Sequence, residues 1–202
     1  MSKKVIWVLF ATLAIVVGLY PGIYLFLDRR FGLLSTKSDA LLSDLFWNSA
    51  FYIHIALAGL AILIGWIQFS TNFRSKNLAL HRLIGKVYIV SALLSSIGGI
   101  YIGFFATGGM VSSVGFVVLG IIWFYTTLKA YLDIRQKNVA EHQKMMIYSY
   151  AACFSGAALR LWLPILIYFL GDFVIAYKTV AWLCWVPNLI VANIIIRRNI
   201  PA

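Results

Sequence analysis

WNSAFYIHIALAGLAILIGWIQF, residues 47–69, is an apolar run without Asp, Glu, Lys or Arg. An α-helix needs about 20 such residues to cross the roughly 30 Å of hydrocarbon in a bilayer. The histidine of this run, His54, lies well inside it, and polar side chains at such depth usually face a bundle interior and mark a site. The run therefore predicts a membrane-spanning helix with one inward-facing imidazole.

Five further apolar runs of similar length lie on either side of this one. The six expected spans are residues 5–27, 47–69, 86–106, 110–132, 145–166 and 174–196. They take up most of the 202 residues, of which 62% are hydrophobic and 11% charged, so a soluble domain has no room. Because lipid offers the backbone no hydrogen bonds, the expected fold is all-α. We expect a single transmembrane domain, a polytopic membrane helical bundle of six transmembrane helices in contact with the lipid bilayer.

Lysine and arginine are unevenly divided between the two sides of this bundle. One side has twelve, at both termini and in the connections after the second and fourth spans. The other side has four, Arg29, Arg30, Lys37 and Lys178, and Arg160 lies within a span. The positive-inside rule therefore predicts that the N-terminus and the C-terminus are both cytoplasmic. Because the net charge of +11 is scattered over short connections, we expect no nucleic-acid partner.

One short pattern occurs twice in the chain. Residues 77–81 read NLALH and residues 138–142 read NVAEH, an offset of 61 positions that also aligns the second span with the fourth. If the similarity reflects a repeat, two helical hairpins are related by an axis along the membrane normal. His81 and His142 would then lie at matching depth near the cytoplasmic surface. Few residues outside the pattern match, so the repeat is a hypothesis.

Small and polar residues form stripes at helical spacing on three of the spans. The stripes are Trp47, Ala50, His54, Ala58, Ala61, Gly65 and Gln68 on the second span; His81, Gly85, Tyr88, Ala92, Ser95 and Gly99 on the third; and His142, Met146, Ser149, Cys153, Gly156 and Arg160 on the fifth. Such stripes let membrane helices pack closely and share hydrogen bonds. We therefore expect their ionisable residues to point inward, toward a core formed by the second to fifth spans.

His81 and His142 are the candidate metal ligands. Neutral imidazole ligates haem iron, and two imidazoles at equal depth on parallel helices suit a bis-histidine haem b. A helix N-terminus disfavours the imidazolium form, which keeps each ring able to ligate. The alternative is that each histidine bonds to lipid headgroups or to a neighbouring loop.

His54 and Arg160 form a second candidate pair, both expected roughly one and a half turns below the outer interface. A buried arginine costs about 2.5–3.5 kcal/mol on insertion scales, so it needs a partner or an exit. One interpretation is that it holds an anionic headgroup, a haem propionate or a quinone oxygen beside His54. The other is that it extends outward to water and pairs with Asp172 or Asp44.

Two motifs carry a resemblance to a known family: His81-Arg82-x-x-Gly85-x-x-Tyr88, and Glu141-His142 through Arg160-Leu161. From about His54 to Pro164 the chain resembles a family of predicted bacterial membrane proteins known only as domain of unknown function 2306. The resemblance implies a multi-pass protein of the bacterial inner membrane and no established activity. It singles out the positions His54, His81, Arg82, Gly85, Tyr88, His142 and Arg160. A looser likeness to transmembrane b-type cytochromes rests on the helical histidines, although a fourth histidine is missing.

The preferred interpretation is a haem b- or quinone-linked redox or electron-transfer protein. The candidate cofactor-binding residues are His81, His142, His54, Arg160, Arg82 and Tyr88, with His81 and His142 as the metal ligands. Two alternatives are a small transporter or permease, and a non-enzymatic accessory or assembly subunit with a partner in a larger membrane complex. The chain has no GxSxG, P-loop, dinucleotide-binding or HExxH motif, so the sequence leaves open whether it is an enzyme.

Overall fold

The computed structural model describes residues 3–26 and 30–200, and within these residues it contains helices and no strands. Six helical segments of the described chain are long and apolar enough to cross a membrane: Lys4–Tyr24, Leu45–Phe69, Leu78–Gly103, Met110–Arg135, Val139–Leu170 and Phe173–Asn199. The predicted all-α bundle with six membrane-spanning segments is therefore confirmed. Leu27, at the end of the first expected span, and Arg29, counted on the outer side, lie outside the described residues.

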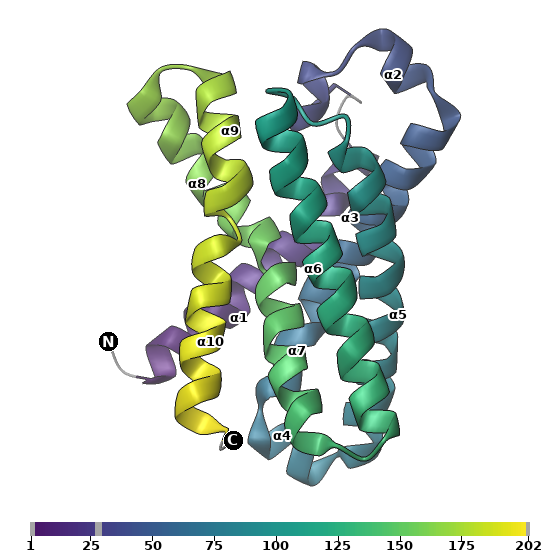
Figure 1. The fold of residues 1–202 in the computed structure, drawn as a ribbon, viewed down its shortest axis with the longest axis vertical. Helices are drawn as coiled ribbons and strands as arrows, with labels where there is room; N and C mark the ends of the chain where they lie inside the picture. The colour runs from purple at the N-terminus through teal and green to yellow at the C-terminus, as the bar shows by residue number, and fades with distance from the viewer. Residues whose placement is uncertain (1–2, 27–29, 201–202) are drawn as a thin grey trace.

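Figure 1 shows how the helices are arranged. The elements are α1 (Lys3–Leu19), η1 (Tyr20–Leu25), η2 (Gly32–Thr36), α2 (Asp39–Ser43), α3 (Leu45–Gly65), η3 (Trp66–Phe69), α4 (Thr71–Lys76), α5 (Leu78–Gly103), α6 (Met110–Arg135), α7 (Val139–Cys153), α8 (Ser155–Leu170), α9 (Phe173–Leu183) and α10 (Val186–Asn199). The turns near α2 and between α8 and α9 lie at one end, and α4 and the turn between α6 and α7 lie at the other (Figure 1). We refer to these as the α2 end and the α4 end.

The core consists of the second to fifth spans, as predicted. The most extensive helix contacts are those of α3 with α5, α6 with α7, and α5 with α6. One reason is the small side chains on the facing surfaces. A Cβ added to Gly98 would lie 2.9 Å from the carbonyl oxygen of Ala50, so only glycine allows α5 to approach α3 this closely.

The other helices cover this core. α1 packs on α3 and runs obliquely to the remaining helices (Figure 1). α9 packs on α8 and α6, and α10 packs on α7. A hydrogen bond of 3.2 Å from the Tyr148 hydroxyl to Asn193 Oδ1 joins α7 to α10.

Four of the six spans consist of two helical elements each, and two of the four junctions lie at prolines. Pro21 lies at the start of η1, just after α1, and Pro187 lies in the first turn of α10, just after α9. Proline has no backbone N–H to donate, so it suits a first helical turn. The break at Phe154 between α7 and α8 has no proline, and the sequence, which indicated one continuous span there, does not predict it. Beyond this break α8 leans away from α7 toward the α2 end (Figure 1).

Candidate functional site

His54 lies on the face of α3 that packs against α5. Its Nδ1 is 2.8 Å from the carbonyl oxygen of Ser95, and the Ser95 hydroxyl donates to the His54 carbonyl oxygen over 2.9 Å. A carbonyl can only accept, so the proton is assigned to Nδ1 and the lone pair to Nε2. Gly99 makes room for the ring, because an added Cβ would lie 2.9 Å from Nδ1.

Arg160, on α8, has no acidic partner in the described part of the chain. Its Nη1 donates to the carbonyl oxygen of Gly156 over 2.8 Å, and its guanidinium carbon lies 4.1 Å above the centre of the Tyr20 ring. Asp44 and Asp172, the partners considered from sequence, instead cap α3 and α9 by accepting from the backbone N–H groups of Trp47 and Ile175. Arg160 is therefore a part-buried cation without a counter-ion among the described residues.

His54 and Arg160 line the same cavity, which has a volume of about 220 Å³. Its walls come from η1, η2, α3 and the five helices α5 to α9, and its aromatic lining residues are Tyr24, Trp47, Phe51, Phe116, Trp123 and Tyr177. Lys37 is the second basic lining residue, and no described aspartate or glutamate lines the cavity. The cavity is thus a mostly apolar space with an excess of positive charge.

Three side-chain nitrogens of the lining residues lack hydrogen-bond partners. Nε of Arg160, Nε1 of Trp47 and Nε1 of Trp123 are all buried and unpaired within the described residues. Most buried polar atoms in proteins are paired, and exceptions often indicate a missing ligand or water. Together with Nε2 of His54, they provide hydrogen-bonding capacity that the protein itself does not use.

Lys37, which follows η2, binds the turn between α5 and α6 at the α2 end of the cavity. Its Nζ donates to the carbonyl oxygen of Phe105 over 2.5 Å and to Oγ1 of Thr107 over 3.0 Å. The hydroxyls of Thr36 and Thr107 are 2.9 Å apart. Partial burial lowers the pKa of Lys37 below its ordinary value, because it disfavours the charged ammonium group. Contacts that join positions about 70 residues apart are not visible in the sequence, which explains why Lys37 was missed there.

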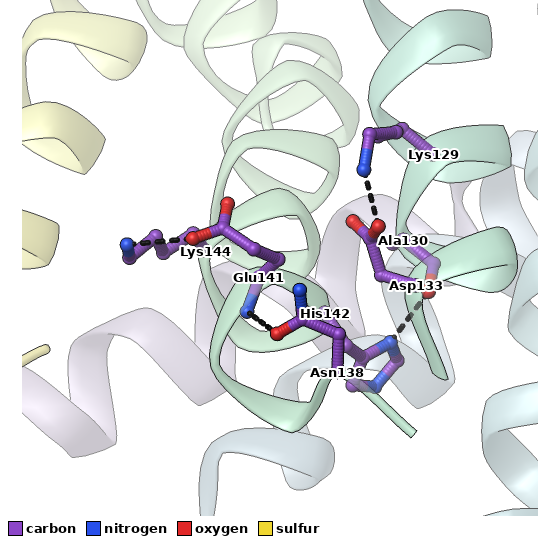
Figure 2. Close-up of polar contacts among 7 residues, drawn as sticks. All are labelled: Lys129, Ala130, Asp133, Asn138, Glu141, His142 and Lys144. Carbon is purple, nitrogen blue, oxygen red and sulfur yellow. Dashed lines mark hydrogen bonds and ion pairs between the residues drawn. The ribbon is translucent and has the colours of Figure 1, made fainter. Parts of the chain in front are cut away.

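His81 and His142 lie near the α4 end, and neither lines this cavity. Nδ1 of His142 is 2.8 Å from the carbonyl oxygen of Ala130 (Figure 2), which assigns the proton to Nδ1 and leaves Nε2 free to ligate. Nδ1 of His81 is buried without a hydrogen-bond partner in the described residues. Their donor chemistry fits a haem iron, whereas the described cavity is at the other end of the bundle.

Two ion pairs lie near His142 (Figure 2). Asp133, 2% exposed, forms an ion pair with Lys129, and Glu141 forms one of 2.8 Å with Lys144. Glu141 is the residue whose backbone N–H is capped by the side chain of Asn138 over 3.3 Å. No group of three or more His, Cys, Asp or Glu residues suited to a metal ion occurs in the described ranges.

Tyr88 lies apart from both pairs, whereas Arg82 follows His81 directly in α5. Tyr88 is fully buried between α5, α6 and α7, where its hydroxyl is 2.9 Å from that of Ser149, which is 2.7 Å from that of Thr127. Arg82 is exposed. Four of the six residues singled out from the sequence therefore form two pairs near opposite ends of the bundle. Tyr88 belongs to a hydroxyl network between them, and Arg82 is exposed beside His81.

Comparison with known proteins yields one match. A family model described as "Predicted membrane protein (DUF2306)" matches residues 51–196, well over half of the chain. The matched range contains His54 and Arg160 as well as His81 and His142. Four residues near the cavity lie before it: Tyr20, Tyr24, Lys37 and Trp47. No curated protein and no solved structure matches the chain.

Proposed function

This chain belongs to that family of predicted membrane proteins of unknown function, and we propose that it is a quinone-linked redox protein whose cavity binds the quinone head group. The observation that carries the proposal is the convergence of Arg160, which lacks a counter-ion in the described chain, and the free Nε2 of His54 on one apolar cavity. The cavity lies in the half of the bundle assigned to the outer leaflet of a bacterial inner membrane, with both termini cytoplasmic.

The chemistry of the lining suits both redox forms of a quinone. A quinone is a flat apolar ring with two carbonyl oxygens that accept hydrogen bonds, and Arg160 supplies N–H donors. A quinol carries hydroxyl groups that donate, and Nε2 of His54 is an acceptor because Nδ1–H is engaged with Ser95. Aromatic residues such as Trp47 and Trp123 line the cavity and supply apolar surface for a flat ring.

The size of the cavity favours a compact ligand. Its volume of about 220 Å³ is below the roughly 300–1,000 Å³ that pockets for drug-sized ligands occupy. A one- or two-ring head group suits this space better than a porphyrin does. We therefore assign the quinone, rather than the haem, to His54 and Arg160.

The haem b predicted from the sequence would bind to the histidine pair near the α4 end rather than in the cavity. His142 and His81 are the residues that would hold it, since each has an uncommitted ring nitrogen in the described structure. Bound there, a haem would supply one-electron chemistry near the α4 end. This part of the proposal is independent of the quinone site.

The absence of acidic residues from the described lining also favours a second candidate, a small permease for an organic anion. Arg160 would then pair with a carboxylate of the transported solute. Binding of a neutral quinone separates the two functions, because a permease for anions has no reason to hold it.

The direct test is isothermal titration of the purified protein with a tailless benzoquinone. We expect saturable binding that Arg160→Gln weakens by about tenfold or more, because a hydrogen bond to a charged group contributes about 1.5–3 kcal/mol. The matched control is Arg135→Gln, an exposed position at the end of α6, which should leave the affinity unchanged. Absence of saturable binding, together with binding of a small carboxylate at the same site, would favour the permease.

A further inference from the structure

A second, smaller cavity of about 80 Å³ adjoins the first. The two share a wall made of His54, Ile55, Ala58, Cys153, Gly156 and Arg160. The residues that line only the smaller cavity are Val17, Pro21, Gly59 and Ile62, all of them apolar. A molecule could therefore place a polar group beside Arg160 and continue into an apolar space on the other side of it.

The smaller cavity lies directly under the surface of the bundle. Val16, next to Val17 in α1, and Leu19, two residues beyond Val17, are each 61% exposed. On the other side of the cavity, Leu161 and Trp162 of α8 are also exposed. One layer of α1 therefore separates the smaller cavity from the surrounding lipid.

The seam between α1 and α8 is the weak part of this layer. α1 is held tightly against α3, where a Cβ added to Gly59 would lie 2.7 Å from the Pro21 ring and 2.8 Å from the carbonyl oxygen of Gly18. By contrast, α1 makes only a few contacts with α8. At this seam the Arg160 guanidinium rests on the Tyr20 ring, a contact between one side chain of α8 and one of η1.

We propose that the smaller cavity is the lateral entrance to the site, through which a lipid-borne ligand enters from the bilayer between α1 and α8. Its occupant in the bound state is the first part of the ligand's hydrocarbon tail, continuous with a head group in the larger cavity. This deepens the proposed function and rests on it, because it identifies the ligand as a tailed quinone rather than a water-soluble one. Arg160, at the shared wall, contacts the ligand where head group and tail meet.

The smaller cavity accommodates the tail, but burial of the tail there adds little to the affinity of the ligand. A tail that leaves lipid for an apolar cavity exchanges one apolar surrounding for another, so little free energy is gained. A blocked entrance, however, excludes a tailed ligand by steric clash. Selective loss of the tailed ligand is therefore the signature of this arrangement.

The test compares two benzoquinones with the same ring, one tailless and one with a decyl tail, bound to the full chain in lipid nanodiscs. Affinities are expressed per mole of ligand in the bilayer, which removes the effect of partitioning. Val17→Phe should weaken binding of the tailed quinone by about tenfold or more and leave the tailless quinone within twofold, because the larger side chain fills the smaller cavity. Val16→Phe is the matched control, next in sequence but facing lipid, and should change neither affinity.

Each outcome decides the proposal. Unchanged binding of the tailed quinone in Val17→Phe would overturn it, and would fit a cavity filled by a lipid chain or left empty. Equal loss of both quinones would overturn it as well, because the substitution would then act on the head-group site. Binding of the tailless quinone checks that the variant is folded, and Val17→Ala, which removes bulk, should retain both affinities. Failure of the proposed function looks different, since the unaltered protein would then bind neither quinone.

Discussion

The hydroxyl oxygens of Tyr88 and Ser149 lie 2.9 Å apart, and these residues are separated by 61 positions in the sequence. His81 and His142 are separated by the same 61 positions. The two hairpins that the repeat would relate, α3 with α5 and α6 with α7, are also the helix pairs with the most extensive contacts. The contact between Tyr88 and Ser149 therefore supports the hypothesis that α5 and α7 occupy corresponding positions.

Tyr88→Phe should destabilise the bundle only moderately. The substitution removes one hydrogen bond and leaves Ser149 paired with Thr127, and interhelical hydrogen bonds in membranes contribute about 0.6 kcal/mol on average. For a chain of this length that corresponds to a fall of about 2 °C in the melting temperature in detergent. Tyr125→Phe, at an exposed position of α6, is the control and should show no change. A loss of many degrees would mean that the hydroxyl network holds the helices together.

Arg160→Met should stabilise the ligand-free protein while it weakens ligand binding. A part-buried cation without a counter-ion costs free energy, whereas methionine fills a similar volume at no such cost. We expect the melting temperature to rise by about 2–4 °C, equivalent to about 1 kcal/mol. Arg135→Met at the surface should leave it unchanged. A marked fall would indicate that Arg160 has a structural partner, in contrast to the unpaired cation described above.

Gly99→Ala should weaken quinone binding through His54. The added Cβ would lie 2.9 Å from the ring, so the imidazole must move and its hydrogen bond to Ser95 must distort. We expect a loss of affinity of about tenfold, measured by titration with the tailless benzoquinone. Gly22→Ala is the matched control, because an added Cβ at Gly22 meets no atom within 4 Å. Unaltered affinity in Gly99→Ala would argue against a role for the His54 ring.

Stability should rise with pH in the alkaline range because of Lys37. The folded-state pKa of Lys37 lies below the ordinary value of 10.5, so the unfolded chain binds more protons than the folded protein between these two values. The free energy of unfolding therefore increases as the pH rises through this window, and the penalty for burying the ammonium group is fully present below it. Thermal melts toward pH 10.5 should show this gain in the unaltered protein and its absence in Lys37→Met. Lys137→Met, at an exposed position, serves as the control for general alkaline effects.

A reduced-minus-oxidised spectrum tests the haem part of the proposal. We expect b-type bands and stoichiometric iron in the purified protein, lost in His81→Ala and in His142→Ala but kept in His54→Ala, because only the first two would hold the iron. The last variant is the matched control, since it alters a histidine of the same bundle at the opposite end. A spectrum without such bands, from protein without bound iron, would remove the haem and leave the quinone site unaffected.

The all-α membrane bundle follows from local properties of the sequence. Apolar runs such as residues 47–69 exclude water-soluble arrangements whatever their neighbours, because each must satisfy its own backbone hydrogen bonds in lipid. Helical spacing likewise predicts which residues of α5 face inward, and Tyr88 and Ser95 are indeed buried. Both inferences depend on residues within a single helix.

The composition of the site depends on residues far apart in the chain. The sequence allowed Arg160 to pair with Asp44 or Asp172, yet both carboxylates cap helices, and the guanidinium rests on Tyr20 instead. Lys37 reaches Thr107, and His54 is fixed by Ser95. The contact of Arg160 with Tyr20 brings α8 against η1, and the other two join α3 to α5 and the segment after η2 to the turn before α6. Packing between helices, rather than the spacing within one, therefore determines which polar groups meet around the cavity.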